Sequence, residues 1–253
     1  MLGRGTYGHV WPVGTDRCQK ELASEFSSDP NERDRHFKEY ETLCGLEHPN
    51  IVPVFGYNCY HSRPPSFEMP RLGPDAGKLL GRKGRGRHSL LSIDQLKNLQ
   101  DALLYLFEEA KLVHFDVKLE NLLVDGSEYV FIDFGLSEKN GTLVDAESVV
   151  TPGYRAPEHQ GVQLVACTSL DVFALGVVAL EMVVRRRLYA EFKKCAGSVI
   201  LMQLLRDRLL REVADADMRG AIAAMLEIDI RQRHMNLVTR RPHAAAICSA
   251  GAQ

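Results

Sequence analysis

Residues 114–121 constrain this chain more than any other stretch; they read His-Phe-Asp-Val-Lys-Leu-Glu-Asn, and Asp-Phe-Gly follows after eleven further residues. The carboxylate of Asp116 is suited to orient a hydroxyl group and accept its proton. Lys118 can neutralise negative charge that develops beside it, while Asn121 and Asp133 offer the hard oxygen ligands that Mg²⁺ prefers. Together these residue types predict a site where a base and a metal ion act on an anionic group.

The order and spacing of these residues resemble the H-x-D-x-K-x-x-N catalytic loop and the D-F-G motif of eukaryotic-type Ser/Thr protein kinases. The resemblance implies that Asp116 accepts the proton of the attacking hydroxyl and that Lys118 balances charge on the transferred phosphoryl group. It also implies that Asn121 and Asp133 hold Mg²⁺ against the phosphates of ATP. Each residue alone could be chance, but the combination is specific.

The composition is that of a folded domain without a strong overall charge. The chain has 253 residues, enough for two lobes with a real core, and 45% of them are hydrophobic. Lys and Arg total 31 against 33 Asp and Glu, so no global field recruits nucleic acid or an anionic membrane. The six cysteines form no C-x-x-C pair, which favours a reducing intracellular compartment, cytoplasmic or nuclear.

The longest apolar run, residues 172–184, is too short to span a bilayer and contains Glu181, so we expect a buried helix there. The N-terminus lacks the charged and then apolar pattern of a signal peptide. We therefore expect no membrane partner.

A glycine-rich segment opens the chain. Gly3, Gly5, Gly8 and Val10 match G-x-G-x-x-G-x-V, in which the glycines let a backbone hairpin lie close over phosphates. Alone the match is weak, because a glycine-rich turn is more often only a turn. The downstream motifs give it weight as an ATP-binding segment.

Two strands are expected next. The turn signal Gly-Thr-Asp-Arg at 14–17 predicts that 10–13 pairs with 18–22, and Pro12 indicates a sheet edge or a bulge because it has no N–H to donate. By resemblance, the residues that would contact ATP from this side include Leu2, Val10, Val13 and Cys18.

Lys20 stands where the family's strand lysine contacts the α- and β-phosphates, although most lysines are solvated surface residues. Its expected partner is Glu39. Asp29 followed by Pro30 predicts a helix start, which places Glu39 mid-helix. Glu41 is the rival, two positions on and therefore on a different face of the helix.

Short strands are expected at 51–55 and 67–69, closing a small antiparallel sheet. The segment Met-Pro-Arg-Leu-Gly-Pro that follows resembles the hinge of casein-kinase-like members of the family. Met69 would border the adenine pocket, the carbonyl of Pro70 would accept from adenine, and the N–H of Leu72 would donate. Moving Pro70 to the donor position would leave no N–H to give. A plain linker is the alternative.

The run between Arg82 and Arg87 is basic and broken by glycines, so it cannot hold a helix. It could bind an acidic partner or nucleic acid, or act as a nuclear-import signal. A solvated loop is the commoner outcome, and we do not expect nucleic acid as a partner.

A helix with an apolar stripe is expected from Ser92, which forms a capping box with Gln95, to about Leu106. Short strands are expected at 122–124 and 129–132. These elements would give the catalytic loop rigid supports on both sides, which a reaction that depends on positioning requires.

Residues 136–150 take the place of the family's activation loop. Thr-Pro-Gly-Tyr-Arg-Ala-Pro-Glu at 151–158 closes it and resembles the T-P-G-Y-x-A-P-E phrase of Ser/Thr kinases. By resemblance, Thr151 and Lys118 both contact the catalytic Asp116, which favours Ser/Thr over Tyr as the acceptor.

Further residues are expected to support the site. By resemblance, Asp171 would hold the catalytic-loop backbone, and Arg233 would pair with Glu158. Phe115 replaces an arginine that pairs with an activation-loop phosphate in many relatives. We therefore predict activity without phosphorylation of the loop hydroxyls, which are Ser137, Thr142 and Ser148.

The resemblance spans residues 3–233 and implies an α+β, two-lobed kinase fold. A small β-rich lobe would cover 1–69, a hinge 70–73 and a larger α-helical lobe 74–253, with ATP between the lobes. Little chain precedes the glycine-rich segment, so either the small lobe is frayed or the start is truncated. Residues 234–253 match nothing in the family and read as a tail. Such a short kinase is similar to the kinases that large DNA viruses encode. If this one is viral, we expect it in the cytoplasm or nucleus of the host cell.

The expected activity is transfer of the γ-phosphate of ATP to Ser or Thr hydroxyls of protein substrates. One alternative is a pseudokinase scaffold, against which stands the complete set of predicted site residues. The other is a small-molecule phosphotransferase, which can share the H-x-D and metal-binding carboxylate. Against that alternative stand the Ala-Pro-Glu phrase and Asp171.

Overall fold

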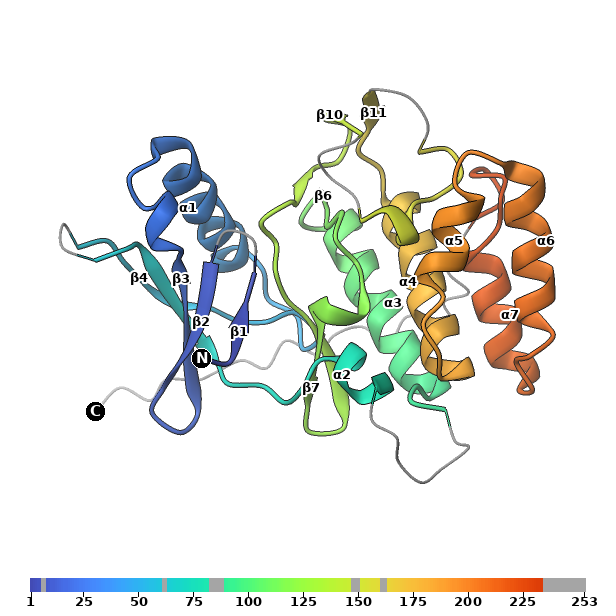
Figure 1. Ribbon diagram of the computed structural model, residues 1–253, viewed down its shortest axis with the longest axis horizontal. Coiled ribbons are helices and arrows are strands. Elements are labelled where there is room, and N and C mark those ends of the chain that lie inside the picture. The colour runs from blue at the N-terminus through green and yellow to red at the C-terminus, as the bar shows by residue number, and fades with distance from the viewer. Residues whose placement is uncertain (6–7, 61–62, 82–88, 147–150, 160–162, 234–253) are drawn as a thin grey trace.

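The computed structural model describes residues 1–5, 8–60, 63–81, 89–146, 151–159 and 163–233. These residues form two lobes, one mostly of strands and one mostly of helices (Figure 1). The predicted α+β class and two-lobed arrangement are therefore confirmed.

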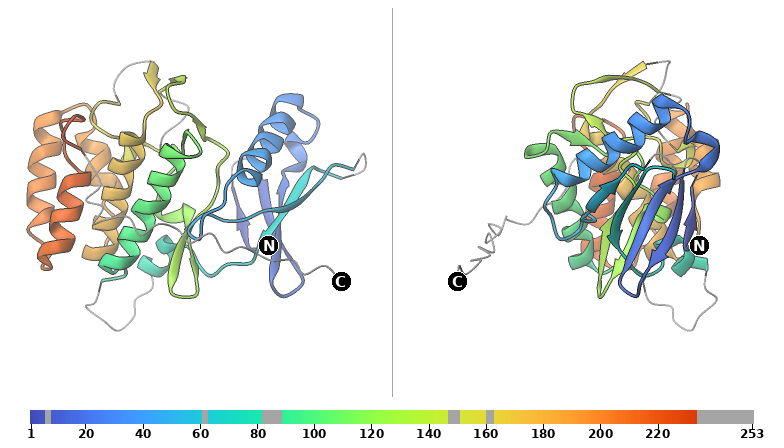
Figure 2. Two further views of the ribbon diagram at one scale, coloured as in Figure 1. Left: turned by 180° about the vertical axis from the view of Figure 1, so that it is seen from behind. Right: turned by 90° about the vertical axis from the view of Figure 1, so that its left-hand side faces the viewer.

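The small lobe is a five-stranded antiparallel sheet in the order β1-β2-β3-β5-β4, with the helix α1 (Pro30–Cys44) packed beside it (Figures 1 and 2). α1 begins as expected, because the Asp29 side chain accepts from the N–H of Asn31 and Pro30 occupies the first turn. The five strands are β1 (Gly3–Arg4), β2 (Gly8–Val13), β3 (Arg17–Leu22), β4 (Phe55–Asn58) and β5 (Ser66–Pro70).

Pro12 lies at an edge of this sheet, as its missing N–H predicts. The N–H of Leu2 donates to the carbonyl of Val10 at 2.8 Å, so Val10, and by alternation Pro12, direct their backbone groups away from β3. In the described part of the chain, the register of β1 with β2 pairs Gly3 with Val10 and Arg4 with His9, so it does not extend to Pro12. On the side of β2 that faces away from β3, no described strand pairs with Pro12, so its missing N–H leaves no carbonyl of a neighbouring strand without a hydrogen bond.

The strand predicted at 51–55 is wrong for most of its length. Ile51 forms an isolated parallel bridge to Phe131, and the N–H of Val52 donates to the Phe131 carbonyl at 3.0 Å. Both side chains are buried. The apolar residues that suggested a small-lobe strand instead join the chain to the large lobe, and β4 begins only at Phe55.

The large lobe is built around α4 (Thr168–Val184), in which every residue from Leu170 to Met182 is buried. A helix that is apolar all round belongs in a core, as the run at 172–184 predicted. α4 packs against α3 (Ile93–Glu108) and α7 (Ala216–Met225). Among the described residues, no helix is long and apolar enough to cross a bilayer.

The remaining elements of the large lobe surround these helices (Figure 1). α3 begins with the predicted capping box between Ser92 and Gln95. The two strands predicted on either side of residue 126 form the hairpin β7–β8. The other elements and their bounds are α2 (Ala76–Gly81), β6 (Leu112–Val113), β7 (Leu122–Asp125), β8 (Glu128–Phe131), β9 (Glu138–Lys139), β10 (Leu143–Asp145), β11 (Gln163–Val165), α5 (Tyr189–Cys195) and α6 (Val199–Leu210).

Candidate active site

The backbone of the loop at 114–121 is held by a carboxylate from the core. Asp171, on α4, is 2% exposed, and its two oxygens accept from the N–H groups of His114 at 2.6 Å and Phe115 at 2.9 Å. Burial raises the pKa of Asp171, and the bonds from the loop counteract that effect. The predicted role of Asp171 in holding this backbone is confirmed.

Phe115 has a backbone φ of 66°, which is uncommon for a bulky residue. Its side chain is buried. A strained conformation of this kind persists only where surrounding contacts fix it, and the bond to Asp171 is such a contact. The loop is therefore shaped by the core of the large lobe.

Three side chains converge on Asp116, which is 6% exposed. Thr151 donates its hydroxyl hydrogen to Oδ1 at 2.9 Å, while Lys118 Nζ and Asn121 Nδ2 contact Oδ2 at 2.6 and 2.8 Å. A carboxylate can accept about four hydrogen bonds. Oδ2 is therefore filled, whereas Oδ1 has capacity for one further hydroxyl.

Lys20, on β3, joins the two lobes through ion pairs. Its Nζ lies 2.6 and 2.9 Å from the carboxylate oxygens of Glu39 and 2.8 Å from Asp133 Oδ1. Burial opposes the charge on Lys20, but Asp133 and Glu39 outweigh it and raise its pKa. Lys20 in turn lowers the pKa of Asp133 to about 2. Both groups are therefore charged at neutral pH.

The glutamate in contact with Lys20 is Glu39, which is 5% exposed, while the rival Glu41 is exposed. Glu39 lies mid-helix on the face of α1 turned toward β3, as expected from the helix start. Burial raises the pKa of Glu39, and Lys20 offsets part of that rise.

Asn121 and Asp133 leave oxygen atoms available for a metal ion. Asn121 uses its amide nitrogen for two bonds to Asp116, to the backbone carbonyl at 2.9 Å and to Oδ2 at 2.8 Å. Its Oδ1 and the Oδ2 of Asp133 have no bond to another described residue, and the Asp133 side chain is 43% exposed. Mg²⁺ is commonly held by one or two protein oxygens together with waters and phosphates, so this donor set fits the ion. Among the described residues, no cluster of three His, Cys, Asp or Glu offers a metal site.

The predicted adenine-binding residues line the end of β5 and the chain after it. Met69 is buried and lies opposite Cys18 across the β3–β5 pair. The N–H of Arg71 donates to the Asp16 carbonyl at 2.8 Å, so the neighbouring Pro70 and Leu72 direct their backbone groups the other way. Among described residues, the only contact to the Pro70 carbonyl is the Cys18 thiol at 3.5 Å, and none accepts from the N–H of Leu72.

The glycine-rich segment is described at Gly3, Gly5 and Gly8. A Cβ on Gly8 would lie 2.8 Å from the Glu21 carbonyl, so pairing with β3 already requires glycine there. A Cβ on Gly5 would meet only ordinary contacts, the nearest being the Gly8 carbonyl at 3.7 Å. Packing against the described residues therefore does not require glycine at position 5, which fits a segment that must approach another group closely.

His114 links the loop to the D-F-G segment, a role that was not predicted from the sequence. Its ring is fully buried, lies 4.5 Å from the Phe134 ring and contacts the Ile132 carbonyl through Nε2 at 3.2 Å. The Nδ1 atom accepts from the N–H of Asp116 at 3.2 Å. The signal for this role was the histidine of the H-x-D motif itself.

α1 makes further contacts with the segment after D-F-G. Arg35 donates from Nε to the Gly135 carbonyl at 3.4 Å, and Lys38 pairs with Glu138 at 2.8 Å. Neither contact was expected from the sequence, because exposed charges on a helix usually face only water.

The segment at 136–150 differs from expectation at one hydroxyl. Ser137 was predicted to be an available loop hydroxyl, but it is 5% exposed and donates to the Phe134 carbonyl at 2.7 Å. Ser137 therefore supports the turn after D-F-G. Thr142 lies just before β10, and Ser148 is outside the described residues.

The closing phrase at 151–158 is fixed to the end of the described chain. Arg233 is buried, and its guanidinium pairs with the Glu158 carboxylate through both terminal nitrogens, as predicted. Tyr154 donates its hydroxyl hydrogen to Glu181 of α4 at 2.9 Å. The phrase is therefore anchored on the same core that holds Asp171.

Comparison with known proteins identifies sequence relatives of this chain. The family model named protein kinase domain matches residues 1–235. The chain is 34% identical over 210 residues to the serine/threonine-protein kinase PknA of Mycobacterium tuberculosis, which covers 75% of this chain and 47% of that protein. It is 30% identical over 249 residues to phytosulfokine receptor 2 of Arabidopsis thaliana, which covers 90% of this chain and 24% of that protein.

The chain thus spans less than half the length of these two relatives. The family model, however, covers nearly all of it. The chain belongs to the protein kinase domain family.

Proposed function

We propose that this protein transfers the γ-phosphate of ATP to Ser and Thr hydroxyls of protein substrates. The observation that carries the proposal is the buried Asp116 carboxylate, which Lys118, Asn121 and Thr151 hold in place. Its Oδ1 keeps one acceptor position open for a substrate hydroxyl. Asp116 would orient this hydroxyl and take its proton as the bond to phosphorus forms.

Two lysines would balance the phosphate charge. Lys118 is bonded to Asp116 and is therefore placed to neutralise the group that Asp116 helps to transfer. Lys20, kept charged by Glu39 and Asp133, would contact the α- and β-phosphates. Phosphoryl transfer depends mainly on positioning and charge, which these fixed cations supply.

Asn121 and Asp133 would hold Mg²⁺ through the oxygens that no described residue uses. When bound, the ion would neutralise charge on the phosphates. The Asp133 carboxylate stays ionised because Lys20 holds its pKa at about 2, so it remains a ligand throughout the physiological range.

The adenine would lie against Val10, Cys18 and Met69, with the carbonyl of Pro70 and the N–H of Leu72 directed to it. The glycine-rich segment, with Leu2, Gly3, Gly5 and Gly8, would cover the phosphates. The backbone groups of Pro70 and Leu72 support this placement, because the bond from Arg71 to Asp16 directs them away from β3 and leaves the N–H of Leu72 without an acceptor among the described residues.

The two alternative functions are a pseudokinase scaffold and a small-molecule phosphotransferase. The assembled group of Asp116, Lys118 and Lys20 argues against a scaffold, because phosphoryl transfer uses such a base together with such cations. Against the small-molecule enzyme stand Asp171 and the Ala-Pro-Glu phrase, whose Glu158 pairs with Arg233, because both are features of the large lobe of protein kinases.

We expect the protein to act inside a cell, in the cytoplasm or the nucleus. We expect neither a membrane nor nucleic acid as a partner. The basic run between Arg82 and Arg87, the weak exception to that expectation, lies outside the described residues.

A peptide array with Mg²⁺-ATP tests the proposal, with peptides centred on Ser, Thr or Tyr and a parallel panel of small alcohols. We expect the wild type to phosphorylate Ser and Thr peptides, and Asp116→Asn to be slower by about a thousandfold. ATP binding without any phosphopeptide would favour the scaffold. Phosphorylation of the small alcohols alone would favour the small-molecule enzyme.

A further inference from the structure

α6 presents apolar side chains to solvent in its first half. Val199, Ile200, Leu201 and Leu204 are 48%, 73%, 50% and 62% exposed, whereas Met202 on the same helix is buried. Single exposed apolar residues are normal, but four within six positions on one helix form a patch. Figure 1 places α6 at the outer edge of the large lobe, beside α5 and α7.

A hollow of about 350 Å³ adjoins the start of this helix. One wall is the segment Arg155 to His159, and the other is formed by Ala196, Gly197 and Met202. The first wall directly continues the stretch from Thr151, whose hydroxyl contacts Asp116. The hollow therefore lies between the segment that follows Thr151 and the chain that enters α6. Among the described residues, its only lining residue on α6 is the buried Met202, and Gly197 in its wall lies two residues before Val199, where the exposed apolar face begins.

His159 gives the hollow a polar group without a partner. The residue is 7% exposed, and its Nε2–H donates to the Ala146 carbonyl at 2.8 Å, so Nδ1 is an acceptor. Within the described part of the chain, Nδ1 is buried and has no hydrogen-bond partner. Burial lowers the pKa of His159, which keeps the ring neutral at physiological pH. A buried acceptor of this kind calls for a donor from outside.

The acidic residues Glu191 and Glu212 near α6 are paired with Arg186 and Arg208, which leaves an excess of basic residues around the patch. Lys194 precedes α6 and Arg211 follows it; both are exposed, and neither forms an ion pair with a described residue. A partner segment that complements this surface has aliphatic side chains, a hydroxyl or amide donor, and acidic residues at its ends.

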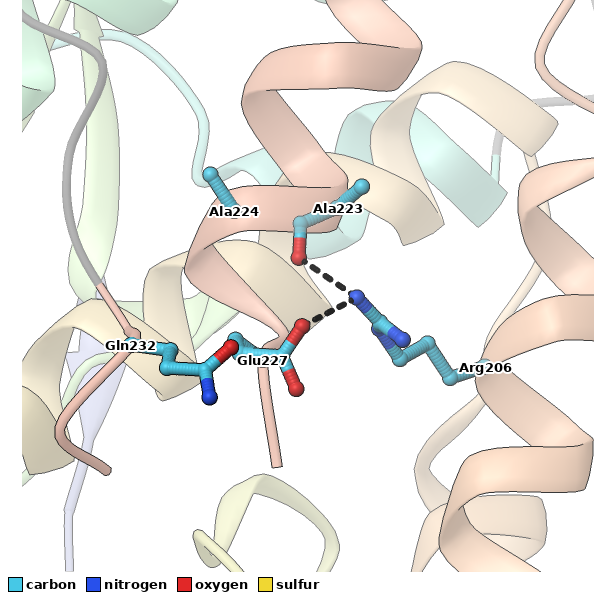
Figure 3. A pocket seen from close by; sticks show the side chains of 5 residues that line it. All are labelled: Arg206, Ala223, Ala224, Glu227 and Gln232. Atoms are coloured by element: carbon cyan, nitrogen blue, oxygen red, sulfur yellow. Dashed lines mark hydrogen bonds and ion pairs between the residues drawn. The ribbon is translucent and has the colours of Figure 1, made fainter. Parts of the chain in front are cut away.

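A second hollow lies between α6 and α7 and differs in character (Figure 3). Arg206 crosses it and donates to the Ala223 carbonyl at 3.1 Å and to Glu227 at 2.8 Å. These bonds join two helices of the same lobe, so this hollow is explained by internal packing and we place no partner there.

We propose that the apolar face of α6 and the adjoining hollow dock the protein substrate, through an apolar segment flanked by acidic residues and separate from the phosphorylated hydroxyl. This proposal rests on the proposed kinase function. The substrate is the chosen occupant because the wall of the hollow is continuous with the segment that contacts Asp116. A docked segment would raise the local concentration of the acceptor at the active site.

Bipartite peptides test this surface. Each carries a phosphoacceptor segment selected on the array, a Gly-Ser linker of variable length, and a docking segment that is aliphatic with Glu ends, aliphatic with Lys ends, or fully polar. We expect the Glu-ended peptide to have a KM about tenfold lower than that of the parent peptide at one or more linker lengths. Ile200→Glu/Leu204→Glu should abolish this gain, whereas the control Phe107→Glu, which alters an exposed apolar residue on α3, should retain it. Lys194→Glu should shift the preference toward the Lys-ended peptide.

The short parent peptide is the control for catalysis, and Ile200→Glu/Leu204→Glu should phosphorylate it at the wild-type rate. A loss of activity that is confined to the bipartite peptides is then a loss of docking. Equal kcat/KM for all bipartite peptides, or a gain that survives in the double variant, overturns the proposal. So does a wild-type dimer that the double variant converts to a monomer in sedimentation, because the occupant is then a second copy.

Discussion

Asp116 and Lys20 are held in opposite ways. Asp116 lies on a loop whose backbone is bonded to Asp171 in the core of the large lobe, and it is 6% exposed. The side chain of Lys20 is 18% exposed and is held by two ion pairs, one of which crosses to Asp133 in the other lobe. The group proposed for the chemical step is therefore part of a rigid core, whereas the group proposed for the phosphates depends on how the lobes are placed.

The contacts between the small lobe and the D-F-G segment also depend on how the two lobes are placed. Besides the Lys20–Asp133 pair, they include Lys38 with Glu138 at 2.8 Å and Arg35 with the Gly135 carbonyl at 3.4 Å. These are polar contacts between partly exposed groups, each of which contributes little on its own. We expect substitutions of Lys20 in the small lobe to change nucleotide binding. Substitutions of Asp116 or Asp171 in the large lobe should instead change the chemical step or the stability of the protein.

The largest effect should follow from Lys20→Met. Loss of this cation would remove the proposed contact with the phosphates, so kcat/KM for ATP should fall by a hundredfold or more. The pKa of Asp133 should rise from about 2, because Lys20 is the main cause of its depression. Steady-state kinetics and carboxylate titration by NMR measure the two changes. Lys38→Met is the matched control, since its side chain is 58% exposed and its loss should cost little. Wild-type kinetics in Lys20→Met would contradict the assignment.

On the large-lobe side, Asp171→Asn should destabilise the protein by about 3 kcal/mol, because an amide NH₂ would face a backbone N–H where a carboxylate oxygen accepted it. Chemical denaturation measures this change. The turnover should also fall, since the loop that carries Asp116 loses its support. Asp207→Asn, with a side chain 49% exposed, is the control and should leave both quantities unchanged. If the Asp171→Asn variant were as stable as the parent, the loop would keep its shape without the carboxylate of Asp171.

His36 makes the small lobe sensitive to acid. It is 5% exposed, and burial followed by the charge of Lys20 lowers its pKa to about 4. The unfolded chain binds a proton near pH 6.5 and the folded chain does not, so the free energy of unfolding should fall as the pH drops from 6.5 toward 4. The expected loss between pH 7.5 and 5 is about 2 kcal/mol. Chemical denaturation of His36→Phe at several pH values should show a free energy of unfolding that lacks this part of the pH dependence. If its pH dependence equals that of the wild type, another group is responsible for the titration.

The smallest effect should come from the loop hydroxyls. Phe115 is buried and uncharged, so a phosphate on the loop lacks the arginine that many relatives provide. The hydroxyl of Ser137 is already bonded to Phe134. Thr142→Ala/Ser148→Ala should therefore keep at least half of the wild-type turnover, and phosphatase treatment should change little. A large loss that acidic replacements restore would show that another cation binds a loop phosphate.

Motifs with strong local chemistry could be predicted from the sequence. The helix start at Asp29 located Glu39, and the ion pair with Lys20 is present in the structure. The apolar run at 172–184 gave the buried helix α4, and the Arg233–Glu158 pair followed from the family phrase.

Features that depend on tertiary contacts could not be predicted. Ile51 and Val52 read as a strand because they are apolar, yet Ile51 forms a bridge to Phe131 of the other lobe and the N–H of Val52 donates to the Phe131 carbonyl. The short strands β9, β10 and β11 have too few residues to show a period, and their pairing is set by the chain around them. The burial of Ser137 and the contacts of Arg35 arise in the same way, from how α1 and the D-F-G segment meet.

Calorimetric titration of Mg²⁺-ATP into Asp116→Asn, paired with its peptide turnover, tests the separation of the two sides most directly. We predict a Kd for ATP within about twofold of the wild-type value, because Lys20, Asn121 and Asp133 are unchanged, together with peptide turnover lower by about a thousandfold. Wild-type turnover in this variant, or a loss of ATP binding as large as that of Lys20→Met, would contradict the assignment of the chemical step to Asp116.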